Sequence, residues 1–562
     1  MKEKYIDLIE TVFGAYTNEH IKEYTKDVFE NGIKEHGYPR LTANLGILIA
    51  HGRKSELKDD FKKMMDFCCS NIPAALEKWG HIGEVGNDFS VKEIIFCLLE
   101  IERAEIFEKS VTDNWRNSLA LINPYKAYRV IAEVPPKRIG NWAAFNAASE
   151  QLRKYAGIGD ESSFIDNQIK SQLFSFDENG MYRDPDEPMV YDMVTRLQLA
   201  LALHFGFDGE ARIELENYLM KSADIILYMQ SVSGEIPFGG RSNQFLHNEA
   251  FLAALCEYYA STFKKRGDLK RAGIFRRAAH IATQSIIPWL KCTQIHHVKN
   301  YYDINSMYGC EQYAHFNKYM ITTASWLYCA YVLADDTIQK VYCSEKYGNF
   351  IWETSQYFHK LFGKFGHYYI EFDTNADTHY DSSGIGRIHR RGAPSAICLS
   401  VPFTEHPNYE LDIANPSPLS ICCGIKHGND YIYACDESTE YTVVEKQISD
   451  NKLFVKLECV LGSGDVISEE VTISENGIEI AAAGQGDLRI LLPAFEFDGE
   501  KHTIIHNTED SVEIEYDDWV CRYTSDCITD TEELYANRNG HYKCFAANGK
   551  NSVSVKISIE QE

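Results

Sequence analysis

Long hydrophobic runs are missing from this 562-residue sequence, and the N-terminus lacks the apolar segment and small-residue cleavage site of a secretory signal. We therefore expect a cytoplasmic protein without a membrane-spanning helix. Basic residues are also scarce, because 56 Lys and Arg stand against 82 Asp and Glu, for a net charge of −26. This balance argues against nucleic acid and anionic membranes as partners, and leaves room for a local basic pocket for an acidic small ligand.

Several motifs of common chemistries are absent too. The sequence has no phosphate-binding Walker loop, no HExxH zinc motif, no nucleophile elbow and no Rossmann glycine fingerprint. Its 16 cysteines are scattered without CxxC pairs, which is typical of reduced thiols. The adjacent His296 and His297 make a weak metal motif, since neighbouring side chains face different directions. We expect no required cofactor, although a structural metal in the C-terminal part stays possible.

The hydrophobic pattern that is present divides the chain in two. Up to about residue 365, apolar residues recur at helical spacing, as in "NEAFLAALCEYYASTF". Later segments such as "LFVKLECVL" and "VISEEVTI" are short, alternate, and are separated by Gly, Asn and Asp. The pattern predicts a toroid of paired helices over residues 1–365 and an antiparallel β-sandwich over 366–562, with "YYIEF" at 368–372 as its first strand.

Polar residues interrupt two of the predicted helices. In "RIGNWAAFNAASEQL" (138–152), Asn141 and Trp142 begin a helix after a glycine, which either a helix cap or a ligand contact explains. On a helix that starts near residue 190, Tyr191, Thr195 and Gln198 share one face. That stripe indicates a wet cavity or, alternatively, a solvent-facing surface on which Asp192 and Arg196 form an ordinary ion pair.

A third cluster, "GGRSNQFLHNEAF" (239–251), places many hydrogen-bonding groups at the start of a helix expected from about Asn243. His247 lies on the apolar face, and Arg241, Asn243 and Asn248 lie within two turns of it. Buried polar groups need partners, so a ligand site explains this concentration better than packing does. Further candidates are Tyr308, Tyr313 and His315, which precede another helix, and His389 and Arg390 beside a predicted strand.

These segments resemble a known group of enzymes. "NW…N" at 141–146, followed by Asp177, Gly180, Tyr182, Pro188 and Tyr191, resembles the heparinase II/III-like and oligoalginate lyases, which combine a helical toroid with a β-sandwich. "IPFGGRS" and "KYMITTASWLYCAYVLADD" resemble a related bacterial domain family of unassigned activity. The resemblance covers most of residues 135–420.

The resemblance implies β-elimination on a uronic-acid glycan. Asn141 and Arg241 would neutralise the substrate carboxylate. Tyr191 and His247 are the candidates for the base and the acid, in either order, with His389 or His315 as substitutes. The expected substrate is a short acidic oligosaccharide. Its binding residues would be Trp142, Tyr182, Asn243, Asn248, Tyr308, Tyr313, His315, His389 and Arg390.

Two other functions remain open. A glycoside hydrolase on the same toroid would use paired carboxylates, for which Asp184, Asp186, Asp192, Glu249 and Glu311 are available. A carbohydrate-binding protein without catalysis would need only the stacking and hydrogen-bonding groups.

Overall fold

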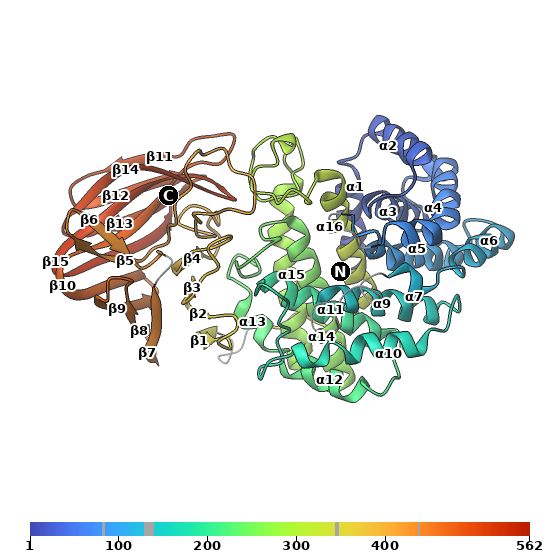
Figure 1. The fold of residues 1–562 in the computed structure, drawn as a ribbon, viewed down its shortest axis with the longest axis horizontal. Coiled ribbons are helices and arrows are strands. Elements are labelled where there is room, and N and C mark those ends of the chain that lie inside the picture. Colours follow the sequence, from blue (N-terminus) through green and yellow to red (C-terminus); the bar gives the residue numbers. More distant parts are fainter. Residues whose placement is uncertain (81–84, 129–139, 343–347, 437–438) are drawn as a thin grey trace.

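Helices and strands occupy opposite parts of the molecule (Figure 1). The computed structural model describes residues 1–80, 85–128, 140–342, 348–436 and 439–562. All described helices precede all described strands, from α1 (Lys2–Phe13) to α16 (Phe316–Leu333) and from β1 (Phe350–Glu353) to β15 (Gly540–Gln561). The predicted order of a helical part followed by antiparallel sheets is confirmed.

The helical part closes into a ring. Its other helices are α2 (Asn18–Asn31), α3 (Gly37–Ala50), α4 (Lys58–Lys78), α5 (Val91–Arg103), α6 (Lys109–Leu119), α7 (Pro124–Ala127), α9 (Asn141–Tyr155), α10 (Ser162–Lys170), α11 (Met189–His204), α12 (Arg212–Lys221), α13 (Ile225–Met229), α14 (Leu246–Lys265) and α15 (Leu269–Leu290). The last helix, α16, packs against α1 and α3, while α14 packs against α11, α15 and α16. Side chains from distant parts of the sequence therefore meet inside the ring.

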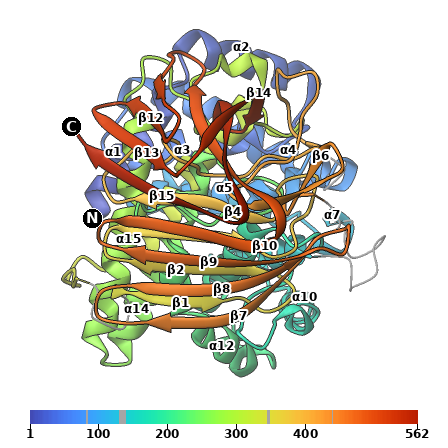
Figure 2. The same ribbon diagram turned by 90° about the vertical axis from the view of Figure 1, so that its left-hand side faces the viewer.

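The strands form two sheets. The smaller sheet has the order β1-β2-β3-β4, with β2 (Lys360–Phe365), β3 (Tyr368–Asp373) and β4 (Gly384–Arg390). The larger sheet contains β5 (Cys423–His427), β6 (Asp430–Tyr433), β7 (Glu440–Ile448), β8 (Leu453–Val460), β9 (Val466–Ser474), β10 (Gly477–Phe497), β11 (Ile504–Asn507), β12 (Ser511–Tyr516), β13 (Trp519–Thr524), β14 (Ile528–Asn537) and β15. The antiparallel pair of β10 and β15 runs through its middle (Figure 2).

The smaller sheet lies between the helices and the larger sheet (Figure 1). Leu361 and Ile370 of the smaller sheet share a buried cluster with Val455 and Val471 of the larger one. Along β8 and β9, buried residues alternate with more exposed ones, as expected where one face of a sheet is covered.

The segment "YYIEF" is a strand as predicted, but it belongs to β3 and two strands precede it, so its predicted place as the first strand is wrong. β2 is buried at nearly every position, since the smaller sheet is covered on both faces. It therefore lacks the alternation by which half-exposed strands are recognised. The division of the chain at residue 366 stays a prediction, although strands begin before that point. Among the described residues, no helix has the length and apolar character needed to cross a bilayer.

Candidate active site

A small cavity of about 60 Å³ lies inside the helical ring. Its walls come from α3, α9, α11, α14 and α16 and from the segments before α5 and α14. The lining residues are His36, Arg40, Phe89, Asn141, Phe145, Val190, Tyr191, Val194, Ser242, His247, Phe251, Tyr319, Thr322 and Trp326. Three of the four predicted catalytic residues, Asn141, Tyr191 and His247, thus meet at one cavity. We call it the ring cavity.

Arg241, the fourth predicted catalytic residue, stands beside this cavity. Its guanidinium lies 4.4 Å from the ring centroid of Tyr191 and forms an ion pair with Asp184. It also donates a hydrogen bond of 2.8 Å to the carbonyl of Pro185. The cation therefore faces both an aromatic ring and a buried carboxylate, and Asp184 offsets much of its charge.

Asp184 also holds Asn141. The backbone N–H of Asn141 donates to Asp184 Oδ1 over 2.8 Å, and its Nδ2 lies 3.1 Å from both carboxylate oxygens. Asn141 is the first residue of α9, and the N-cap residue Gly140 has no side chain that could accept a hydrogen bond. The carboxylate of Asp184 therefore accepts from the free backbone N–H at the start of this helix. Burial raises the pKa of Asp184, against the opposing effects of Arg241 and Asn141.

Tyr191 belongs to a chain of hydroxyl groups. Its hydroxyl lies 3.0 Å from Ser242 Oγ, which lies 2.8 Å from the hydroxyl of Tyr313. Burial raises the pKa of Tyr191, while the charge of Arg241 works in the opposite direction. Tyr191 is therefore protonated at neutral pH and can donate a proton.

The segment before α14 sets the position of Ser242. The predicted start of this helix near Asn243 is wrong, because α14 begins at Leu246. Ser242 and Gln244 have φ values of 62° and 65°, in the left-handed region that interrupts a helix. The N–H of Ser242 donates to Glu311 Oε1 over 2.6 Å. Glu311 in turn pairs with Arg538, which follows β14, at 2.8 Å.

His247 is a neutral imidazole within an aromatic cluster. Its ring lies parallel to that of Phe245, with centroids 5.5 Å apart, and edge-on to Tyr319 at 5.3 Å. Burial, Arg40 and His297 lower the pKa of His247 to about 3. Its buried Nδ1 has no hydrogen-bond partner among the described residues. This nitrogen is available to a bound molecule.

Arg40, which sequence reasoning missed, brings a buried cation to the opposite wall. It donates to Thr322 Oγ1 over 2.7 Å and lies 3.4 Å from Glu93 Oε1. The same oxygen lies 2.6 Å from Lys92 Nζ, which sits 4.6 Å from the centroid of the Trp326 ring. Two cations therefore share one carboxylate, and this wall carries excess positive charge. The available signal was a polar pair, Arg40 and Asn44, spaced i, i+4 on an apolar helix.

Four predicted binding residues lie around the segment before α14 or at the start of α9. Tyr313 ends the hydroxyl chain, and Asn248 Nδ2 donates to the carbonyl of Ser242 over 3.0 Å. Asn243 Nδ2 donates to the carbonyl of Pro237 over 3.1 Å. The half-buried Trp142 follows Asn141 but is not part of the cavity lining. Asn243 and Asn248 thus hold the backbone in place.

The structure places the other predicted binding residues away from the ring cavity. Tyr182 is buried with its hydroxyl on Gln172, and Tyr308 stacks on Tyr302 with centroids 3.6 Å apart. His315 is an exposed residue at the start of α16. His389 lies between the hydroxyls of Ser231 and Ser400, and Arg390 covers the ring of Trp519. Sequence spacing could not separate them, because it does not fix how loops and strands fold back on the ring.

Comparisons with known proteins bear on the fold. No family model matches the chain, and no curated protein matches it. A mutant of the heparan sulfate lyase HepC from Pedobacter heparinus matches with a TM-score of 0.50 at 11% identity, covering 93% of this chain and 75% of that chain. The chain shares its overall fold with this solved structure. The predicted toroid followed by a β-sandwich, and the resemblance to heparinase-like lyases, are confirmed at the level of fold.

Weaker matches include enzymes of two kinds. The chondroitin AC lyase of Streptomyces coelicolor A3 has a TM-score of 0.46 at 9% identity, with 100% of this chain and 83% of that chain covered. A β-L-arabinofuranosidase from Geobacillus stearothermophilus T6 has a TM-score of 0.34 at 10% identity, with 98% of both chains covered.

The carboxylates expected for a hydrolase are occupied or exposed. Asp192 pairs with Arg196 inside the ring, so these two residues form the expected i, i+4 pair but not on a solvent-facing surface. Glu249 pairs with Lys299 at 2.8 Å. Asp184 and Glu311 pair with arginines as described, and the side chain of Asp186 is 78% exposed. Among the described residues, no group of three or more His, Cys, Asp and Glu is arranged to hold a metal ion.

Proposed function

We propose that this chain is a lyase that cleaves uronic-acid-containing oligosaccharides by β-elimination. The observation that carries the proposal is the composition of the ring cavity. The described residues of its lining include two tyrosines, two histidines, an asparagine and an arginine, and no carboxylate. Proton transfer by Tyr and His fits this set, whereas hydrolysis by two carboxylates does not.

The substrate carboxylate is the first group that the site must stabilise. Removing the C5 proton places negative charge beside this carboxylate, so preorganised cations and donors must face it. Arg40 fits this task, because Arg40 and Lys92 share a single carboxylate and leave excess positive charge. Arg241 and Asn141 add donors on the other side, although Asp184 already accepts hydrogen bonds from both.

We assign the base to His247 and the acid to Tyr191. His247 is neutral and has a free nitrogen, so it can accept the C5 proton. The electron pair of the C5–H bond forms the C4=C5 double bond as the C4–O bond breaks. Tyr191 is protonated and donates to the leaving oxygen, and Ser242 and Tyr313 can return a proton to it. A bound carboxylate would raise the pKa of His247 and strengthen it as a base.

The proposal requires no cofactor and assigns a short acidic oligosaccharide as substrate. A glycoside hydrolase is less well supported, because each buried carboxylate that it would use is paired with a cation. A protein that only binds carbohydrate would not need the hydroxyl chain that joins Tyr191 to Tyr313.

The test is a screen of uronic-acid oligosaccharides followed by near-ultraviolet absorbance, which reports the unsaturated product. We expect turnover by the wild type and a loss of kcat of roughly hundredfold or more in Tyr191→Phe and in His247→Ala. Tyr259→Phe is the matched control, because it removes the hydroxyl of a fully buried tyrosine on α14 that bonds the carbonyl of Leu219. Full activity in Tyr191→Phe would refute the assignment of the acid.

A further inference from the structure

A second and much larger pocket, of about 640 Å³, lies where the helical ring meets the sheets. Its walls come from α15, from the segments around residues 232–235 and 299–301, and from the loops and strands of residues 391–400 and 495–519. A pocket of this volume can hold a small molecule, and such pockets are frequent at domain boundaries. We call it the boundary pocket. None of the described residues that line it also lines the ring cavity.

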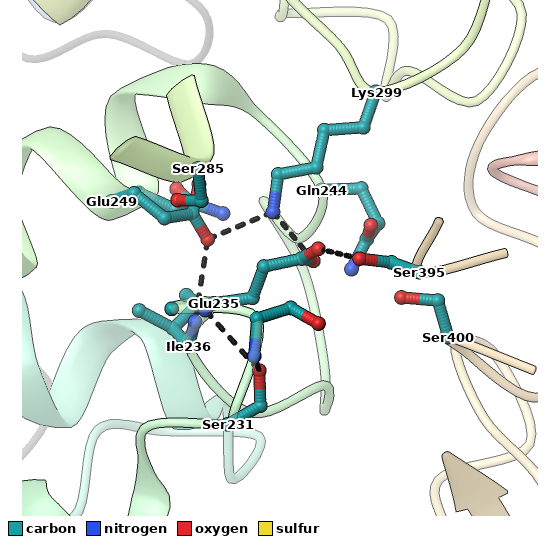
Figure 3. Close-up of polar contacts among 12 residues, drawn as sticks. Ser231, Glu235, Ile236, Gln244, Glu249, Ser285, Lys299, Ser395 and Ser400 are labelled. Atoms are coloured by element: carbon teal, nitrogen blue, oxygen red, sulfur yellow. Dashed lines mark hydrogen bonds and ion pairs between the residues drawn. The ribbon is translucent and has the colours of Figure 1, made fainter. Parts of the chain in front are cut away.

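The wall nearest the ring is held rigid by a buried charge cluster (Figure 3). Lys299 Nζ lies 2.9 Å from Glu235 Oε2 and 2.8 Å from Glu249 Oε1. The hydroxyl of Ser395, which follows β4, donates to Glu235. This contact joins the sheet side to the ring side, so the pocket is built from both parts at once.

The lining combines aromatic rings with hydroxyl and amide groups. Trp289 and Tyr301 come from the ring side, with ring centroids 5.0 Å apart, and Trp519 comes from the sheet side. Ser233 and Asn539 also line the pocket. Aromatic faces with nearby hydrogen-bonding groups suit a sugar, which presents both C–H faces and hydroxyls.

Two lining atoms lack partners. Ser233 Oγ and Asn539 Oδ1 are buried, and neither has a hydrogen-bond partner among the described residues. Asn539 is 5% exposed, and its Nδ2 donates to Gln244 Oε1 over 3.2 Å and to the carbonyl of Lys299 over 3.0 Å. The side-chain amide of Asn539 is thus held in place by its Nδ2, while its Oδ1 accepts no hydrogen bond from the described residues. Hydroxyl groups of a ligand would satisfy both atoms.

The charges of the pocket favour an anion. Arg277 on α15 and the exposed Arg391 after β4 line it from the two sides. Arg277 lies 4.6 Å from the ring centroid of Tyr342, and neither arginine forms an ion pair with a carboxylate of the described residues. The three lining carboxylates, by contrast, are occupied. Glu235 pairs with Lys299 and Asp517 with Lys501, while Asp498 accepts from Tyr516 and from the N–H groups of Glu500 and Lys501, each over 2.7 Å. Two uncompensated arginines stand out in a chain with a net charge of −26.

We propose that the boundary pocket is a second carbohydrate site that binds an acidic mono- or disaccharide. Arg277 and Arg391 would bind its carboxylate, the aromatic rings would pack against its sugar faces, and Ser233 and Asn539 would bind its hydroxyls. The inference does not depend on catalysis at the ring cavity.

The test is calorimetric titration of the full chain carrying Tyr191→Phe, which prevents turnover at the ring cavity if the lyase proposal holds. The probes are digalacturonate, dimannuronate and a glucuronate-containing disaccharide, with cellobiose as the neutral control. We expect at least one uronate to bind and cellobiose to bind more weakly. Adding Arg277→Gln and Arg391→Gln should weaken that binding roughly tenfold to a hundredfold, because charge-assisted hydrogen bonds are lost.

Arg266→Gln is the matched control, since Arg266 is an exposed arginine at the end of α14, away from this pocket. It should leave the affinity unchanged. The inference is overturned if no uronate binds, if cellobiose binds equally well, or if the arginine variants bind as tightly as their parent. Arginine-dependent binding in a chain whose wild type cleaves no glycan would support the boundary pocket and refute the lyase proposal.

Discussion

Replacing His359 by glutamine should remove a pH-dependent part of the stability of this protein. His359 precedes β2 and connects the smaller sheet to the turn formed by Asp186 and Glu187. Its Nδ1 lies 2.5 Å from Asp373 Oδ1, and its Nε2 lies 3.0 Å from Glu187 Oε2. Glu187 and Asp186 have φ values of 58° and 67°, so this strained turn needs an external contact to hold it.

The magnitude follows from the pKa of His359. Burial lowers this pKa, but Asp373 and Glu187 outweigh burial and raise it to about 9 from an ordinary value of 6.5. At ~1.4 kcal/mol per pH unit, the difference corresponds to about 3 kcal/mol of folding free energy. Because the folded pKa is the higher one, this stabilisation is complete below about pH 6.5 and is lost as the pH rises through about 9.

Urea denaturation followed by tryptophan fluorescence measures the effect. The free energy of unfolding of the wild type should exceed that of His359→Gln by about 3 kcal/mol more at about pH 6 than at about pH 10. The matched control is His379→Gln, which alters a histidine whose side chain is 55% exposed and should change the free energy of unfolding by less than about 0.5 kcal/mol. A wild-type advantage that stays constant or grows with pH would refute the reasoning.

Three further predictions concern the ring cavity. Arg40→Gln should raise KM for an acidic oligosaccharide roughly tenfold or more, because the excess charge of that wall is lost, and steady-state kinetics against a neutral analogue would check it. Asp184→Asn should lower the free energy of unfolding by about 2 kcal/mol, because Arg241 loses its buried partner but stays partly exposed. Urea denaturation measures this loss, and an unchanged free energy of unfolding would contradict the prediction. Gly240→Ala should lower kcat while the protein stays folded. Gly240 has a φ of 73°, and an added Cβ would lie only 2.7 Å from Pro188 Cα, so the segment that carries Ser242 would be displaced. Steady-state kinetics and urea denaturation of the same variant measure the two effects.

The sequence predicted the fold class because helical and strand periodicities survive burial. It also predicted that Asn141, Tyr191 and His247 would meet, and all three line the ring cavity. Polar side chains on otherwise apolar helices indicate a shared polar cavity inside the helical part. The catalytic roles of these three residues remain predictions. Thr195 and Gln198, on the same face as Tyr191, are fully buried, in agreement with an inward-facing stripe.

Other features could not be predicted from one sequence. Asp184 holds both Asn141 and Arg241, but these contacts span 43 and 57 positions and depend on how the chain folds back. Tyr308 and His389 have the same chemistry as the cavity residues and lie elsewhere, because residue type does not reveal which side of a loop a side chain faces. Arg40, by contrast, could have been found, because it forms a polar i, i+4 pair with Asn44 on an otherwise largely apolar helix.

The most direct test of the central claim is cleavage of an acidic oligosaccharide in oxygen-18 water, followed by mass spectrometry of both products. β-Elimination needs no water, so the account predicts an unsaturated product and no heavy oxygen in either new chain end. A saturated product that carries one heavy oxygen atom would mean hydrolysis and would contradict the account.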